Sequence, residues 1–194
     1  ANNLEVTEVA DINGTVTITT AILDANGEFD ATGGTITFTG AGDLQLGGAV
    51  THLGDISTGA GTVTYNGTAQ NIFADIYFNL TAPGTGTVTK TLAGAVTVNG
   101  VLTIGSNVTV AMATNNLTVV GLADIDGIVT ITTATLDADG EFDAENGTIT
   151  FTSTGNLELG GTVTHLGTLS DGAGTVNYNM AGSQNIFADT YFNL

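Results

Sequence analysis

The sequence has no cysteine, no tryptophan and no arginine, and its only basic residue is Lys90. Without cysteine the chain can form neither disulfides nor thiolate metal sites. The 19 acidic residues give a formal net charge of −18. Nucleic acids and anionic membranes are bound through Lys and Arg, so this charge excludes a nucleic-acid partner. We also expect no membrane insertion, because no apolar run reaches the roughly 18 residues that a spanning helix needs.

A long internal repeat dominates the sequence. Residues 1–66 align without a gap on 114–179, with 46 of the 66 positions identical. After one inserted residue the match resumes, as QNIFADIYFNL at 70–80 and QNIFADTYFNL at 184–194. The second copy stops where the first continues, so we expect an excerpt of a longer repetitive chain; the alternative is a neighbouring subunit that caps this end. The parts are repeat unit 1 at 1–80, a single-copy part at 81–113 and repeat unit 2 at 114–194.

Short segments alternate threonine with valine, isoleucine or phenylalanine. This period of two, with many β-branched residues, predicts half-buried strands with the apolar side chains inward and the threonines outward. The segments are TVTIT at 15–19, TITFT at 35–39, TVTY at 62–65, TVTK at 87–90, VTVNG at 96–100 and NVTV at 107–110. Glycine and asparagine between them suit tight corners. The pattern predicts an all-β protein.

The strands are short and closely spaced, which favours a parallel β-helix, or β-solenoid. At roughly 20–25 residues per coil, one 113-residue unit makes about five coils and rises by about 24 Å along the axis, because neighbouring strands lie about 4.8 Å apart. We expect one continuous solenoid. The alternative is a row of tandem β-sandwich domains, since about 100 residues also suits an immunoglobulin-like module.

An acidic string, LDANGEFD at 23–30, returns as LDADGEFD at 136–143. Calcium takes six to eight oxygen ligands, and acidic residues spaced by two around a glycine turn can supply several. The candidate calcium ligands are Asp24, Asn26, Glu28, Asp30, Asp137, Asp139, Glu141 and Asp143. The string resembles the start of an EF-hand loop but lacks the closing glutamate. A solvated acidic turn is therefore the alternative interpretation.

The sequence contains no catalytic constellation, so we do not expect an enzyme. His52 and His165 occupy the same position in the two repeat units. We therefore expect each to have a structural role rather than to form a catalytic dyad. A polysaccharide-active β-helix enzyme is a minor alternative, because carboxylate pairs are abundant, but Lys90 alone cannot bind an acidic sugar. The threonine pairs make an ice-binding solenoid a second minor alternative, although their spacing is uneven.

The stretch GTVTYNGTAQNIFADIYFNLTAPGTGTVTKTLAGAVTVNGVLTIGSNVTV, at 61–110, resembles the repetitive parts of large bacterial secreted surface proteins. These are filamentous-haemagglutinin-like adhesins, autotransporter passengers and envelope repeat proteins, and the similarity runs along the whole chain. The resemblance implies a parallel β-helix, export to the cell surface or beyond it, and a role in adhesion or as a fibre. It brings no catalytic residues to transfer.

From these observations we expect a non-catalytic structural protein of an extracellular filament or cell-surface fibre. The solenoid ends are open sheet edges, so we expect the chain to assemble with itself, end to end or laterally. The alternative is a stalk or passenger segment of a large bacterial adhesin, in which another domain binds a host or surface ligand.

Overall fold

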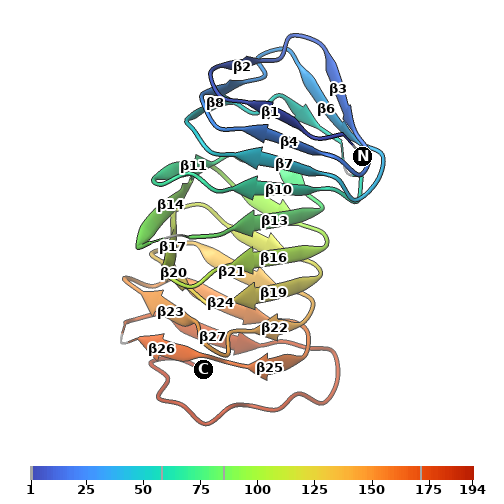
Figure 1. The fold of residues 1–194 in the computed structure, drawn as a ribbon. Coiled ribbons are helices and arrows are strands. Elements are labelled where there is room, and N and C mark those ends of the chain that lie inside the picture. Colours follow the sequence, from blue (N-terminus) through green and yellow to red (C-terminus); the bar gives the residue numbers. More distant parts are fainter. Residues whose placement is uncertain (1, 58, 85, 171) are drawn as a thin grey trace.

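The chain winds into a parallel β-solenoid in the computed structural model, which describes residues 2–57, 59–84, 86–170 and 172–194 (Figure 1). Each coil contributes three short strands, one to each face, and the described residues form nine stacked coils. The described residues contain no helix, and hence none that could cross a membrane. The predicted all-β parallel β-helix is confirmed, and the alternative of tandem sandwiches is wrong.

One face is a single sheet that runs the length of the described solenoid. Its nine strands are β1 (Leu4–Val6), β4 (Ile22–Ala25), β7 (Asp43–Leu46), β10 (Thr62–Tyr65), β13 (Asn79–Ala82), β16 (Val101–Ile104), β19 (Leu122–Ile125), β22 (Phe142–Asp143) and β25 (Val163–His165). Val63 stacks on Leu80, and Leu80 stacks on Leu102, so the first of these two coils is the shorter. Coil length therefore varies along the solenoid, and the shortest coils fall below the range expected from the sequence.

The other two faces are interrupted between the third and fourth coils. Before the interruption they consist of β2 (Ala10–Asp11), β5 (Phe29–Asp30) and β8 (Val50–His52), and of β3 (Thr15–Ile18), β6 (Thr35–Phe38) and β9 (Asp55–Ile56). After it, one face consists of β11 (Gln70–Ile72), β14 (Val88–Leu92), β17 (Val108–Ala113), β20 (Ile128–Ile131), β23 (Thr148–Phe151) and β26 (Thr168–Ser170). The other consists of β12 (Ile76–Tyr77), β15 (Val96–Val98), β18 (Leu117–Val119), β21 (Thr135–Ala138), β24 (Asn156–Leu159) and β27 (Thr175–Tyr178).

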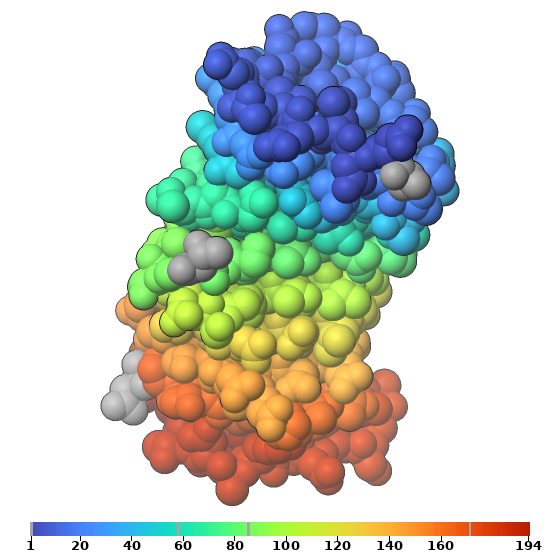
Figure 2. Space-filling model, viewed as in Figure 1, coloured from blue at the N-terminus to red at the C-terminus, as the bar shows by residue number. Residues whose placement is uncertain are grey.

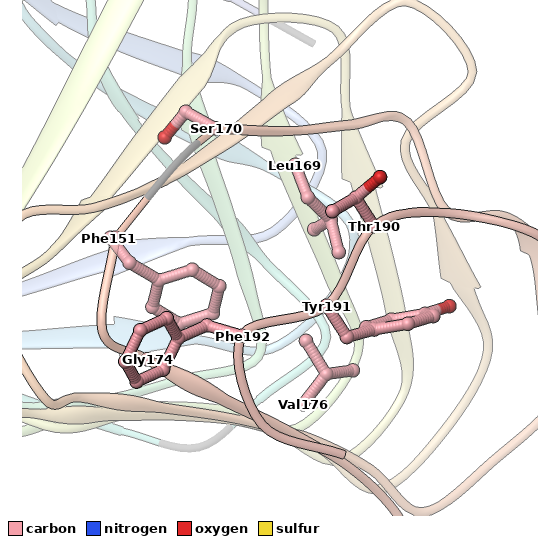
Figure 3. A pocket seen from close by; sticks show the side chains of 9 residues that line it. Phe151, Leu169, Ser170, Gly174, Val176, Thr190, Tyr191 and Phe192 are labelled. Atoms are coloured by element: carbon pink, nitrogen blue, oxygen red, sulfur yellow. The ribbon is translucent and has the colours of Figure 1, made fainter.

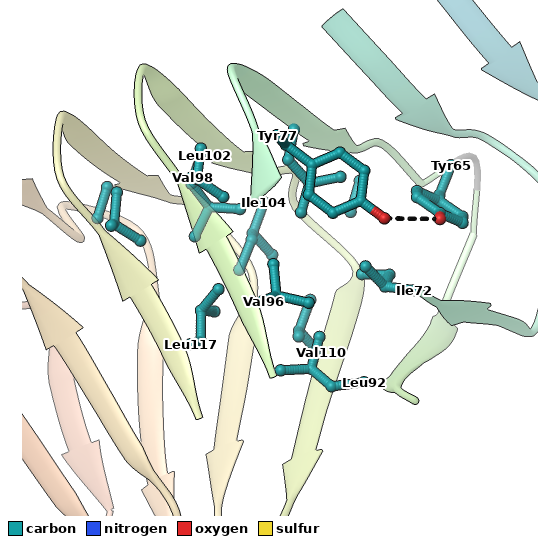
Figure 4. Close-up of a cluster of buried hydrophobic side chains, with 14 of the residues drawn as sticks. Tyr65, Ile72, Tyr77, Leu92, Val96, Val98, Leu102, Ile104, Val110 and Leu117 are labelled. Atoms are coloured by element: carbon teal, nitrogen blue, oxygen red, sulfur yellow. Dashed lines mark hydrogen bonds between the residues drawn. The ribbon is translucent and has the colours of Figure 1, made fainter. Parts of the chain in front are cut away.

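Apolar side chains point inward from all three faces and form one core (Figure 4). In β17, Val108 and Val110 are buried while Thr109 between them is partly exposed. Outward threonines form rungs between coils, as where the hydroxyls of Thr19 and Thr39 lie 2.8 Å apart. The predicted alternation, with apolar residues in and threonines out, is confirmed.

The two repeat copies do not lie on the same face of the solenoid. Strand β1 belongs to the nine-stranded sheet, whereas its copy β18, 17 strands later, belongs to the sheet of β12 and β15. One unit thus spans five coils and two further strands, rather than about five coils. At about 4.8 Å per coil, the rise per unit becomes about 27 Å instead of about 24 Å. Each unit is turned by one face relative to the unit before it.

Candidate functional site

The first acidic string wraps around a corner of the coil, between β4 and β5. Asp24 lies on the face of β4 and Asp30 on the face of β5, with Asn26 and Glu28 exposed at the corner. The Asn26 amide donates to Asp24 Oδ2 over 3.5 Å. The other carboxylate oxygen of Asp24 is buried and has no hydrogen-bond partner. The structure therefore brings Asp24 and Asn26 together at this corner.

Glu28 and Asp30 have other partners. Thr51 on the next coil donates its hydroxyl to Glu28 Oε1 over 2.5 Å. Thr32 donates its backbone N–H and its hydroxyl to Asp30 Oδ1, over 2.9 and 2.6 Å. These two bonds hold the pKa of Asp30 below its ordinary value. Both carboxylates are thus tied to threonines rather than turned toward Asp24.

The second acidic string wraps around the equivalent corner, between β21 and β22. Thr164 donates to Glu141 Oε1 over 2.7 Å, and His165 Nδ1 lies 3.0 Å from Asp143 Oδ1. Burial raises the pKa of Asp137, and the nearby charge of Asp139 raises it further.

Among the residues that the structure describes, no three His, Asp or Glu side chains are grouped so that they could hold a metal ion. In each acidic string the carboxylates are spread around a corner of the coil and do not converge on one position. Calcium binding by the eight candidate residues stays a prediction.

The interruption between the third and fourth coils is bridged by the side chain of Gln70. Its amide nitrogen donates to Leu46 O and to Gly48 O, both over 2.8 Å. Gln184 in the second copy makes the same bonds, to Leu159 O over 2.9 Å and Gly161 O over 2.8 Å. Where the face of β8 and β11 loses its backbone ladder, a side-chain amide joins the coils instead.

Lys90, the only basic residue of the chain, is fully buried beside Gln70. Gln70, Lys90, Tyr65 and Tyr77 are together called the junction. Lys90 points inward because it lies on β14 in phase with Val88 and Leu92. Its ammonium donates to Gln70 Oε1 over 2.6 Å, to Thr68 O over 3.0 Å and to Gly67 O. Burial lowers the pKa of Lys90 to about 8, because a charged group loses its hydration there.

A pair of tyrosines completes the junction (Figure 4). The rings of Tyr65 and Tyr77 meet edge to face with centroids 6.5 Å apart, and their hydroxyls lie 3.0 Å apart. Tyr77 Oη donates to Phe73 O over 2.8 Å, and Phe73 N–H donates to Tyr65 Oη over 3.2 Å. Burial raises the pKa of Tyr65 to about 12. Tyr178 and Tyr191 form the same pair in the second copy, with hydroxyls 3.1 Å apart.

The C-terminal end of the solenoid exposes residues that are buried in the first copy. Ile72 is 1% exposed and stacks on Leu92, whereas its copy Ile186 is 58% exposed. Residues 184–194 form no strand, although 70–80 with nearly the same sequence contain β11, β12 and the start of β13. Figure 2 shows these last residues, in red, covering one end of the elongated molecule.

A hollow of about 290 Å³ opens beside this end (Figure 3). The side chains of Phe151, Leu169, Val176, Tyr191 and Phe192 line it. The hollow is thus lined mainly by apolar side chains.

No protein-family model matches this chain, and no curated protein or solved structure matches it. The assignment of the fold as a β-solenoid rests on the parallel strand pairing in the structure. Membership of a particular adhesin or autotransporter family stays a prediction from the sequence resemblance.

Sequence reasoning missed the junction of Gln70, Lys90, Tyr65 and Tyr77. Its signal was present, because Lys90 occupies an inward position of an alternating strand. The recurrence of Gln, Phe and Tyr in QNIFAD and YFNL was a second signal.

Proposed function

We propose that this chain is a non-catalytic structural segment of an extracellular filament or cell-surface fibre. The observation that carries the proposal is a single apolar core that continues from the first copy, through residues 81–113, into the second. In such a solenoid each coil contacts only its neighbours, so added coils extend the molecule without a new core. Length and stiffness are then the properties that the fold supplies.

The surface charge supports an extracellular setting. Lys90 is buried, and the sequence has no other Lys or Arg, so the charged side chains at the surface of this chain are acidic. Such a surface is highly soluble, and dissolved cations screen its self-repulsion.

Self-assembly is supported by the unpaired edge at the N-terminal end. Among the described strands, β1, β2 and β3 pair on one side only, with β4, β5 and β6. Val6 O accepts Asn26 N–H over 2.9 Å, so the neighbouring Glu5 directs its backbone groups away from β4. These free groups can pair with a second copy, and a head-to-tail contact that does not close produces a filament.

Sedimentation of the purified chain tests this proposal. We expect oligomers that grow with protein and salt concentration, because salt screens the repulsion between acidic copies. Glu5→Pro removes a free backbone donor from the edge and should reduce assembly. Glu5→Thr, which places the residue of the second copy at this position, keeps the donor and is the matched control. A monomer at every concentration and salt would overturn the proposal.

The second candidate is a stalk segment of a large adhesin, with the ligand bound by another domain. The uninterrupted core through residues 81–113 favours it as well, since a stalk also needs length. Discrete rods of nine coils, about 43 Å long at about 4.8 Å per coil, would favour the stalk over the filament.

A further inference from the structure

The repeat shows what covers a solenoid end of this sequence. In the first copy, residues 70–80 are followed by a coil that contains β14, β15 and β16. That coil stacks Val98 on Tyr77 and Leu102 on Leu80, and Leu80 is 1% exposed. In the second copy the equivalent of Leu80 is Leu194, which is 63% exposed. The first copy therefore shows which coil covers this end. We call the end the acceptor and the coil that covers it the complement.

The acceptor also has a polar position that the complement occupies in the first copy. Gln70 Oε1 accepts from the ammonium of Lys90, which β14 brings. Its copy Gln184 anchors its amide in the same way, but its Oε1 accepts the Met180 N–H over 3.2 Å. An ammonium is a stronger donor than this backbone amide. Gln184 therefore offers an acceptor that a lysine could take.

A surface groove flanks the place where that lysine-bearing strand would lie, because in the first copy the strand forms one wall of this groove. In the first copy the groove is lined by Gln70 and Asn71 on one side and by Thr89 and Thr91 of β14 on the other. In the second copy a hollow of about 120 Å³ lies beside Gln184. Its lining residues are Thr162, Val163, Met180, Ser183, Gln184 and Asn185. Met180 is a lining residue with no counterpart in the first groove, and its flexible side chain can move aside.

We propose that the C-terminal end of the solenoid binds a further coil with the chemistry of residues 81–104, in parallel, with an inward lysine donating to Gln184 Oε1. The coil would cover Ile186, Tyr191 and Leu194 as its counterpart covers Ile72, Tyr77 and Leu80. This rests on the proposed function and names the partner chemistry of that end. The N-terminal edge of a second copy is a poorer match, because β1 (LEV) carries Glu5 and no lysine.

A synthetic peptide with the sequence of residues 81–104, added to the full chain, tests the proposal. We expect saturable binding and protection of the amides of residues 184–194 from hydrogen exchange. The peptide carrying Lys90→Met should bind about tenfold or more weakly, the loss typical of a hydrogen bond to a charged group. A peptide with Thr89→Lys and Lys90→Thr keeps the charge but turns the lysine outward, and it should bind as weakly.

Variants of the chain complete the test. Gln184→Ala should weaken the natural peptide by a similar factor and leave the Lys90→Met peptide almost unaffected. Asn71→Ala, at the exposed position of the first copy that corresponds to Asn185, is not part of the C-terminal end; it is the control and should have little effect. Equal binding of all three peptides, protection outside 184–194, or no binding would each overturn the proposal.

The two proposals fail separately. If the chain forms filaments that the peptide neither caps nor binds, the lysine acceptor is wrong and the structural function stands. If the peptide binds a chain that stays monomeric, the acceptor stands and self-assembly is wrong.

Discussion

Lys90 should make the chain more stable as the pH rises above neutral. Burial lowers its pKa to about 8 in the folded chain, against an ordinary value of 10.5. The folded state therefore releases this proton at a lower pH than the unfolded state does. Between these two values the unfolded chain binds more protons, and the free energy of unfolding rises with pH. The difference between the two pKa values corresponds to about 3 kcal/mol in all.

The effect of Lys90 on stability is best measured between pH 7 and 9.5. Proton linkage gives about 2 kcal/mol of added stability over this range. The carboxylates are already ionised there, and the tyrosines of the unfolded chain begin to ionise near pH 10. Above that value the trend should reverse, since burial raises the pKa of Tyr65 to about 12 and ionisation then favours the unfolded state.

Urea unfolding followed by far-ultraviolet circular dichroism at several pH values measures this trend. The Lys90→Met variant should lose the increase between pH 7 and 9.5, whatever its stability at pH 7. A flat profile for the natural chain would refute the reasoning. So would an equal increase in the Lys90→Met variant, because the proton would then belong to another group.

Three further predictions concern the tyrosine pairs, the backbone at Ala113 and the burial of Lys90. Tyr65→Phe breaks one buried and one partly buried hydrogen bond and should lower the free energy of unfolding by about 1–3 kcal/mol, whereas Tyr178→Phe, at the less buried copy, should cost less. Ala113 has a φ of 54°, so Ala113→Gly should raise stability by about 0.5–1 kcal/mol in thermal unfolding, and Ala111→Gly on the same strand should lower it. Trypsin should leave the folded chain intact, because its one site, Lys90, is buried, and should cut the urea-unfolded chain once; rapid cutting of the folded chain would contradict the burial.

The solenoid could be predicted from the sequence because each strand carries its own signal. Alternating threonine and apolar residues set the inward face of every strand, and glycine corners separate the strands. The number of strands per unit was less accessible, because coil length varies, as between the coil from Val63 to Leu80 and the coil from Leu80 to Leu102. Small differences at the corners decide whether one repeat unit closes a whole number of coils. One repeat unit contains two strands more than five whole coils, and these extra strands turn each unit by one face relative to the unit before it.

The junction was hidden by the usual exposure of lysine. Charged side chains are rarely fully buried, so a single lysine in a strand is normally assigned to the surface. The phase of Lys90 with Val88 and Leu92 is the stronger signal, since a strand directs alternate residues to one side. The end of the chain shows another limit of local reasoning. Residues 70–80 and 184–194 have nearly the same sequence, yet only the former pair with a following coil and form strands.

Electron cryo-microscopy of the purified chain, at high concentration and in salt that screens its charge, tests the structural role most directly. The proposed function predicts fibres with a layer line at about 4.8 Å along the axis and a subunit spacing of about 43 Å, or one coil more. Native material built from further repeat units should instead show a unit rise of about 27 Å. Single particles without axial stacking, at every concentration and salt, would contradict the account.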